Sequence, residues 1–179
     1  MPRYVALLRG INLGRRRPAM SELRDHFEAL GFSKVGTFIS SGNVIFETRA
    51  IQTAKLEQRI EKHLAAKLGY EVDTFILRDA EVIAATDSTA FPEGTPEGGG
   101  LYVTFLKQPL YASTIKKLTA CRSQIDEFHL NGREIYWLCR TKSSDSKIWT
   151  SPEVKALKLS TGTMRNLTSL RKLVAKSFE

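Results

Sequence analysis

The chain has few cysteines and no long apolar run, and each absence excludes a class of protein. Cys121 and Cys139 are the only cysteines and form no Cys-x-x-Cys pair, so two reduced thiols of a cytosolic protein are expected. The longest apolar runs have four or five residues, whereas a membrane-spanning helix needs about 20. No apolar core follows the first basic residue, as a signal peptide would require. We therefore expect a cytoplasmic protein that does not enter a membrane.

Standard catalytic signatures are also missing. No phosphate-binding P-loop, dinucleotide fingerprint or serine nucleophile elbow occurs. His26, His63 and His129 are scattered without the i, i+4 spacing of a zinc helix, and His26 and His63 are expected at the surface. His129 is two residues from Glu127 and so shares a strand face with it. The two could form an acid–base pair, but a polar outer face of the sheet is the more common arrangement. No metal or cofactor is predicted, catalytic residues stay unknown, and enzyme activity stays open.

The net charge of +8 is unevenly spread over the 179 residues. Residues 1–50 carry +4, residues 51–97 carry −4 and residues 98–179 carry +8. The hydrophobic fraction of 42% and the charged fraction of 26% are those of an ordinary globular protein. Basic surface therefore belongs to the start and the last third of the chain, which favours phosphate-bearing partners or nucleic acid.

The stretch from Val5 to Arg17 runs from an apolar strand into a glycine-rich, basic loop. Tyr4–Leu8 has the composition of a buried strand, and Gly10, Asn12 and Gly14 are residue types that tolerate positive φ. Such a loop can turn backbone N–H groups toward a ligand, and its arginines favour an anion. The alternative is a strand-to-helix turn with a solvated basic flank. Arg9, which follows the apolar run, is expected to be held by the fold, whereas Arg15–Arg17 are expected to be exposed.

The first half shows alternating helix and strand patterns. Met20, Leu23, Phe27 and Leu30 form one helical face that Gly31 ends, and Gly69 ends a second helix over 56–68. Strands are predicted at 4–8, 34–39, 44–48 and 71–77. The order β-α-β-β-α-β over residues 3–78 predicts a ferredoxin-like sheet of the α+β class.

The turn Ser41-Gly42-Asn43 joins the second and third predicted strands. Ser41 could donate to a phosphate and Asn43 could recognise a base edge, but these residues are also what a tight hairpin needs, and we favour the hairpin. We expect the first and third strands to be parallel. That would place this turn at the opposite end of the sheet from the first loop.

The second half begins after a stretch rich in proline and glycine at 91–100, which is predicted as a linker between halves 1–90 and 101–179. A strand at 101–106, a helix at 111–121, a hairpin of 127–130 with 134–138 and a helix at 153–157 follow. Asn131-Gly132 predicts a two-residue type I′ turn in that hairpin. A last helix is expected within 163–178, so the second, smaller half is of the βαββα type.

Arg165-Asn166 is the best companion to the first loop. Asn166 is suited to cap a helix that starts at Leu167, and Arg165 beside that helix end could bind an anion. The alternative is a capping Asn beside an exposed Arg. The predicted anion site comprises Arg9, Gly10, Asn12, Arg165 and Asn166, with Ser41, Asn43, Arg15, Arg16 and Arg17 as further candidates.

Several motifs, in the order in which they occur, resemble the domain of unknown function 1697 family. They are Ala6-Leu7-Leu8-Arg9-Gly10-Ile11-Asn12-Leu13-Gly14, Met20-x-x-Leu23-Arg24, Gly31-Phe32, Ser41-Gly42-Asn43-Val44-Ile45-Phe46 and Thr163-Met164-Arg165-Asn166. The resemblance implies an intracellular, typically bacterial α+β protein without an established activity. Ser40 stands where the family pattern has Gln, and Leu167 stands where it has an aromatic residue. A role for that amide or that ring is therefore in question for this chain.

Two functions from different classes remain. The first is a non-catalytic binding module for a phosphate-bearing ligand, possible partners being a small molecule or nucleic acid. Phe38 and Phe46 lie in strands, as in ferredoxin-like RNA binders, but no RNA-binding consensus surrounds them. The second is an enzyme acting on a phosphorylated or carboxylated small molecule, anchored by Arg9, Asn12 and the Arg165-Asn166 pair. A structural role in an assembly is a third reading, and the oligomeric state is open.

Overall fold

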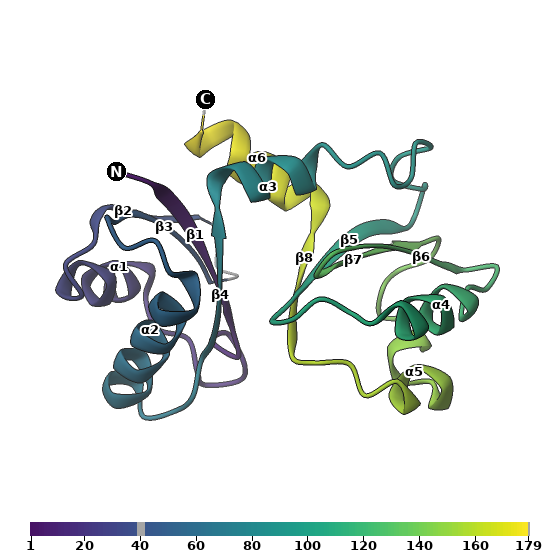
Figure 1. The fold of residues 1–179 in the computed structure, drawn as a ribbon, viewed down its shortest axis with the longest axis horizontal. Coiled ribbons are helices and arrows are strands. Elements are labelled where there is room, and N and C mark those ends of the chain that lie inside the picture. The colour runs from purple at the N-terminus through teal and green to yellow at the C-terminus, as the bar shows by residue number, and fades with distance from the viewer. Residues whose placement is uncertain (39–41, 179) are drawn as a thin grey trace. The chain divides into compact units, whose positions relative to one another are not determined.

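The computed structural model describes residues 1–38 and 42–178. The chain divides into two compact units, Met1–Ile83 and Ala84–Ser177, so the division falls before the predicted linker at 91–100. Each unit contains its own four-stranded antiparallel sheet (Figure 1). Within the described ranges, no helix has both the length and the apolar character needed to cross a membrane.

The first unit has the predicted ferredoxin-like topology. Its sheet has the strand order β2-β3-β1-β4, and α1 and α2 cover one face of it (Figure 1). The elements are β1 (Arg3–Arg9), α1 (Met20–Ala29), β2 (Ser33–Phe38), β3 (Asn43–Glu47), α2 (Thr53–Leu68) and β4 (Asp73–Arg78), followed by α3 (Asp79–Thr86).

The core of the first unit lies between the sheet and its two helices. Alternate residues of β1 face the helices and pack with apolar residues of α1 and α2; the set is Tyr4, Ala6, Leu8, Leu23, Phe27, Leu56, Ile60 and Leu64. Val5 and Leu7, on the opposite face of β1, are also buried, which explains why the strand is apolar at every position from Tyr4 to Leu8. Gly69 ends α2 in the left-handed conformation with φ of 80°, as its position in the sequence predicts.

The direction of β3 corrects the expectation that the first and third strands are parallel. β3 pairs antiparallel with β1, with Leu7 opposite Asn43. The cause is the short hairpin after β2, which sends β3 back between β2 and β1. The hairpin therefore lies at the same end of the sheet as the loop after β1. Leu8 N donates to Gly42 O at 2.8 Å, and a Cβ on Gly42 (φ 78°) would lie 2.8 Å from Ile11 Cγ2.

Three glutamates cover the open edge of β4, which is the last strand of its sheet. Every second backbone N–H of β4 points away from β1 and so lacks a partner strand. The Thr74 N–H donates to Glu61 at 2.8 Å, the Ile76 N–H to Glu57 at 2.9 Å and the Arg78 N–H to Glu81 at 2.7 Å. These bonds satisfy edge donors that have no partner strand, and they occupy one oxygen of each carboxylate.

The second unit has the same strand order as the first, with its own second, third, first and fourth strands side by side as β6-β7-β5-β8. Its elements are β5 (Gly100–Leu106), α4 (Ala112–Ala120), β6 (Asp126–Asn131), β7 (Glu134–Cys139), a 3₁₀ turn (Ile148–Thr150), α5 (Pro152–Ala156), β8 (Gly162–Asn166) and α6 (Leu167–Ser177). The predicted βαββα half thus gains a fourth strand, β8. Sequence patterns missed it because its five residues contain a single large apolar side chain, Met164.

The hairpin between β6 and β7 turns one residue later than predicted. Asn131 is still paired, opposite Glu134, so the turn residues are Gly132 and Arg133. Gly132 has φ of 59°, and Arg133 is not among the residues with positive φ. Glycine at the first turn position alone is the pattern of a type II′ turn, not of type I′.

Asp126 fastens several segments of the second unit to its core. The Trp137 indole N–H and the Ser146 hydroxyl each donate to Asp126 Oδ1 at 2.8 Å, and the Ser123 hydroxyl donates to Oδ2 at 3.2 Å. Trp137 packs edge-on against Trp149 in this core. The buried carboxylate accepts hydrogen bonds at both of its oxygens. These bonds hold the loop around Ser146 against β6 and β7.

Candidate functional site

The loop of residues 9–17, which we call the arginine loop, leaves β1 and forms a tight turn at its tip. The Arg16 N–H donates to Leu13 O at 2.9 Å, and Gly14 within that turn has φ of 57°. Gly10 has φ of 79° where the loop leaves the strand. The glycines therefore have the turn role that the sequence predicts. Asn12 is exposed, and Leu13 is 65% exposed at the tip.

Arg9 connects the start of the arginine loop to β4. Its Nη1 lies 3.4 Å from Asp73 Oδ2, so Arg9 forms an ion pair with a residue of β4. Both side chains are about half exposed, at 51% and 50%, so this is a surface ion pair and not a buried one. Surface pairs of this kind contribute about 0–1 kcal/mol to stability.

Arg16 lies on an aromatic platform. Its guanidinium carbon is 4.7 Å from the centre of the Tyr70 ring, which follows the C-terminal end of α2. Arg15 and Arg17, its two neighbours in the sequence, are exposed, as predicted. Within the described part of the chain, none of these three arginines forms an ion pair with a carboxylate. Burial raises the pKa of Tyr70, against the effect of Arg16, so the ring stays neutral at physiological pH.

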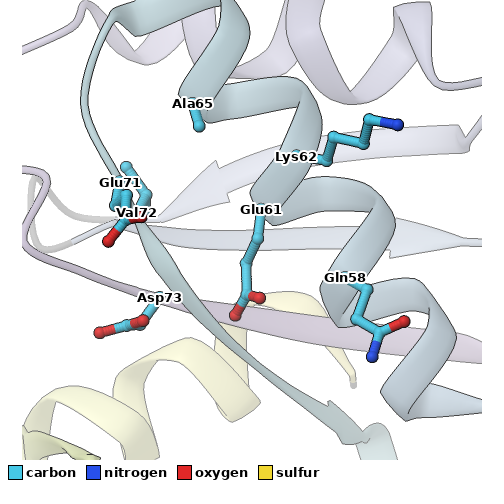
Figure 2. A pocket seen from close by; sticks show the side chains of 7 residues that line it. All are labelled: Gln58, Glu61, Lys62, Ala65, Glu71, Val72 and Asp73. Atoms are coloured by element: carbon cyan, nitrogen blue, oxygen red, sulfur yellow. The ribbon is translucent and has the colours of Figure 1, made fainter.

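An acidic hollow of about 350 Å³ adjoins this loop between α2 and β4 (Figure 2). Glu71 and Asp73 contribute from the strand side and Glu61 from the helix, where Figure 2 shows it pointing toward the strand while Lys62 points away. One Glu61 oxygen is held by β4, and Asp73 pairs with Arg9. The carboxylates make this hollow unsuited to a phosphate. The positive surface of the arginine loop therefore ends on the side where the hollow begins.

Asn43 has the structural role that we favoured for its turn. It is 2% exposed, and its side-chain amide donates to Phe38 O at 3.2 Å across the hairpin. A buried amide bonded to the backbone is not available to read a ligand. Ser41, the other candidate in this turn, lies outside the described residues.

Arg165 and Asn166 belong to β8 of the second unit. Arg165 is 8% exposed and donates to Thr163 Oγ1 at 2.7 Å and to Met164 O at 2.9 Å. Burial lowers its pKa to about 10, which leaves it charged at neutral pH. Asn166 caps α6 as predicted, because its Oδ1 accepts from Thr168 N at 2.9 Å and Ser169 N at 3.4 Å.

These hydrogen bonds weaken the case for an anion held by Arg165 and Asn166. The Asn166 cap uses two of the N–H groups at the start of α6 that an anion would need. The arginine loop lies in the first unit and these two residues in the second. A site shared by Arg9, Asn12, Arg165 and Asn166 stays a prediction.

The histidines occupy positions that the sequence did not indicate. His26 of α1 and His63 of α2, expected separately at the surface, meet between the two helices, with Nδ1 of His26 3.3 Å from Nε2 of His63. Burial lowers the pKa of His63, with smaller contributions from His26 and nearby cations. Glu127, which the sequence offered as an alternative acid–base partner of His129, pairs with Arg140 at 2.5 Å. No group of three metal-binding side chains occurs among the residues that the structure describes.

Comparison with known proteins identifies relatives but no activity. The family model described as protein of unknown function (DUF1697) matches residues 1–136. The fold is similar to that of a solved structure, the conserved bacterial protein SP0830 from Streptococcus pneumoniae. The two share 22% sequence identity with a TM-score of 0.75, over 100% of this chain and 99% of that one. A search of curated proteins found no match.

Proposed function

For this chain, which belongs to the DUF1697 family of proteins of unknown function, we propose binding of a phosphate-bearing ligand through the arginine loop. The ligand class includes nucleic acid, and the contacts are made by Arg15, Arg16 and Arg17. Guanidinium groups suit phosphate because their planar donors match its oxygens in pairs.

The observation that carries this proposal is the position of Arg16 over Tyr70. A long side chain loses rotamer entropy when it binds, and an arginine already held on a ring loses less of it. The flanking arginines have no carboxylate partner among the described residues, so their charge is available to a ligand. Arg9 is a weaker contact because it would first have to leave Asp73.

The burial of Phe46 favours binding by the arginine loop over stacking of bases on this residue of the sheet. Phe46 is fully buried and stacks on Phe32 at 4.5 Å, in the core beneath the helices. A ring in that position cannot stack on a base, as the sheet aromatics of many ferredoxin-like RNA binders do. Nucleic acid would therefore contact the loop through its backbone phosphates, with little dependence on base sequence.

The salt dependence of binding tests the proposal. The full chain is titrated with a single-stranded oligonucleotide and, separately, with inorganic phosphate over a range of salt concentrations. In the triple variant Arg15→Ser, Arg16→Ser, Arg17→Ser, the slope of log K against log salt should become shallower by about 2, the value for three lost phosphate contacts. The folded protein should lose little stability, since the three side chains are exposed.

The matched control removes the same charge from the exposed surface of the second unit. In the triple variant Lys116→Ser, Lys117→Ser, Arg122→Ser, the slope should stay close to that of the wild type. Equal losses in both variants would mean that only the net charge matters, and the proposal would fail. Binding of inorganic phosphate with a slope near 1, lost in the first variant alone, would instead favour a small phosphorylated ligand, as the alternative enzyme function requires.

A further inference from the structure

A second hollow, of about 360 Å³, lies in the second unit, and sequence patterns did not indicate it. It is formed where the segment after α3 passes the ends of β6 and β7. Its polar lining residues are Asp87, Ser88, Thr89, His129, Asn131 and Tyr136. We call it the Tyr136 hollow. Four of these side chains belong to exposed residues, whereas Tyr136 is 3% exposed and forms part of its buried wall.

Tyr136 is held in one protonation state by its surroundings. Its hydroxyl donates to Glu134 Oε2 at 3.1 Å. Burial raises the pKa of Tyr136, the Glu134 charge and hydrogen bond raise it further, and a hydrogen bond from Ser88 acts in the opposite direction. The phenol therefore stays neutral at physiological pH, with its proton directed to Glu134.

The segment that completes the hollow is fixed by local hydrogen bonds. The Ala90 N–H donates to the Ser88 hydroxyl at 3.3 Å, which shapes a turn at Ser88. Arg171 of α6 donates from Nε to Thr86 O at 3.2 Å, and so ties the start of the segment to a helix of the same unit. The hollow is therefore present without a ligand, and binding need not order this segment.

The chemistry of the lining selects the class of ligand. No lysine or arginine is among the described residues that line the hollow, whereas Asp87 lines it and Glu134 accepts from the Tyr136 hydroxyl. A phosphate or carboxylate would be repelled. Hydroxyl, amide and imidazole groups can both donate and accept hydrogen bonds, as can each hydroxyl of a polyol. A carboxylate such as Asp87 can accept from two neighbouring hydroxyls of one ligand.

We propose that the Tyr136 hollow binds a neutral polyhydroxylated small molecule, such as a monosaccharide, with Asp87 accepting from adjacent ligand hydroxyls. Ser88, Thr89 and Asn131 complete the hydrogen bonds around it, above the buried Tyr136. This site is separate from the arginine loop in residues and in charge, so it stands whether or not the loop binds phosphate.

Titration of the full chain with D-ribose, followed by backbone amide chemical shifts, tests the site. Shifts should be confined to residues 84–90 and 129–136 and should saturate. Asp87→Ala should weaken binding by about tenfold or more, because it removes the hydrogen bonds that the carboxylate accepts from two ligand hydroxyls. Asp87 is exposed, so this variant should fold normally, and a spectrum unchanged outside the hollow would confirm that. Tyr136→Phe keeps the ring and reports on the hydroxyl.

Asp145→Ala is the control, because Asp145 is an exposed aspartate of the same unit outside the hollow. Its affinity for ribose should equal that of the wild type. The proposal is overturned if ribose causes no saturating shifts, or if both aspartate variants lose affinity equally. It is also overturned if inorganic phosphate shifts the same residues at lower concentration than ribose does.

Discussion

Replacing Asp126 should destabilise the second unit more than any other single change to a polar residue considered above. Asp126 is 5% exposed and accepts hydrogen bonds from Trp137, Ser146 and Ser123. Asp126→Ala removes all three bonds at once. It also leaves the indole N–H of Trp137, itself 2% exposed, without a partner in the core.

The magnitude follows from these contacts. A hydrogen bond to a charged group contributes about 1.5–3 kcal/mol, and an orphaned buried donor costs about 1–3 kcal/mol. Because the Ser123 and Ser146 hydroxyls can turn to water, we expect Asp126→Ala to lower the free energy of unfolding by about 3–5 kcal/mol. Asp126→Asn keeps an oxygen for Trp137 and Ser146, so its cost should be about 1–2 kcal/mol. The melting temperature should fall by about 10 °C or more for Ala.

Urea unfolding followed by tryptophan fluorescence measures this effect directly. Trp137 and Trp149 are the only tryptophans, and both lie in the second unit, so the signal reports on that unit. Asp145→Ala, an exposed aspartate of the same unit, should change the unfolding free energy by less than about 0.5 kcal/mol. If Asp126→Ala costs less than about 1 kcal/mol, or no more than Asp126→Asn, the buried network does not hold this unit together.

Three further predictions concern charge. The lowered pKa of His63 means that the unfolded chain binds its proton first, so stability should be flat above the ordinary value of 6.5 and fall as pH drops below it. A His63→Gln variant, monitored by thermal melts from pH 8 to pH 5, should lose part of that slope; an unchanged slope would contradict the assignment. Arg9→Ala should cost less than about 1 kcal/mol and Arg15–Arg17→Ser should leave the melting temperature nearly unchanged, because all four residues are exposed; a larger loss in either melt would show an unrecognised role. If the two predicted anion regions converge, sulfate should stabilise the wild type beyond a chloride control of equal ionic strength, and an Asn12→Ala, Arg165→Ala double variant should lose that increment while the general effect of sulfate persists. An equal increment in both proteins would remove the shared site.

What the sequence determined by itself is what depends on near neighbours in the chain. The four-residue spacing of Leu56, Ile60 and Leu64 required a helix, and Gly69 could end it because glycine adopts positive φ without strain. Asn166 likewise predicted the start of α6, because its side chain can cap the first N–H groups of a helix. Gly10, Gly14 and the arginines specified a basic turn after β1, because those conformational and charge properties belong to the residues themselves.

Tertiary structure alone decided which distant groups meet. Period-two patterns tell which residues form strands but not which strands lie side by side, so the pairing of β1 with β3 could not be read from them. The ring beneath Arg16 belongs to Tyr70, and the partner of His26 is on another helix. The Tyr136 hollow likewise needs β6, β7 and the segment after α3 together. These sites depend on contacts between segments far apart in the chain, and such contacts leave no periodic signal in any one of the segments.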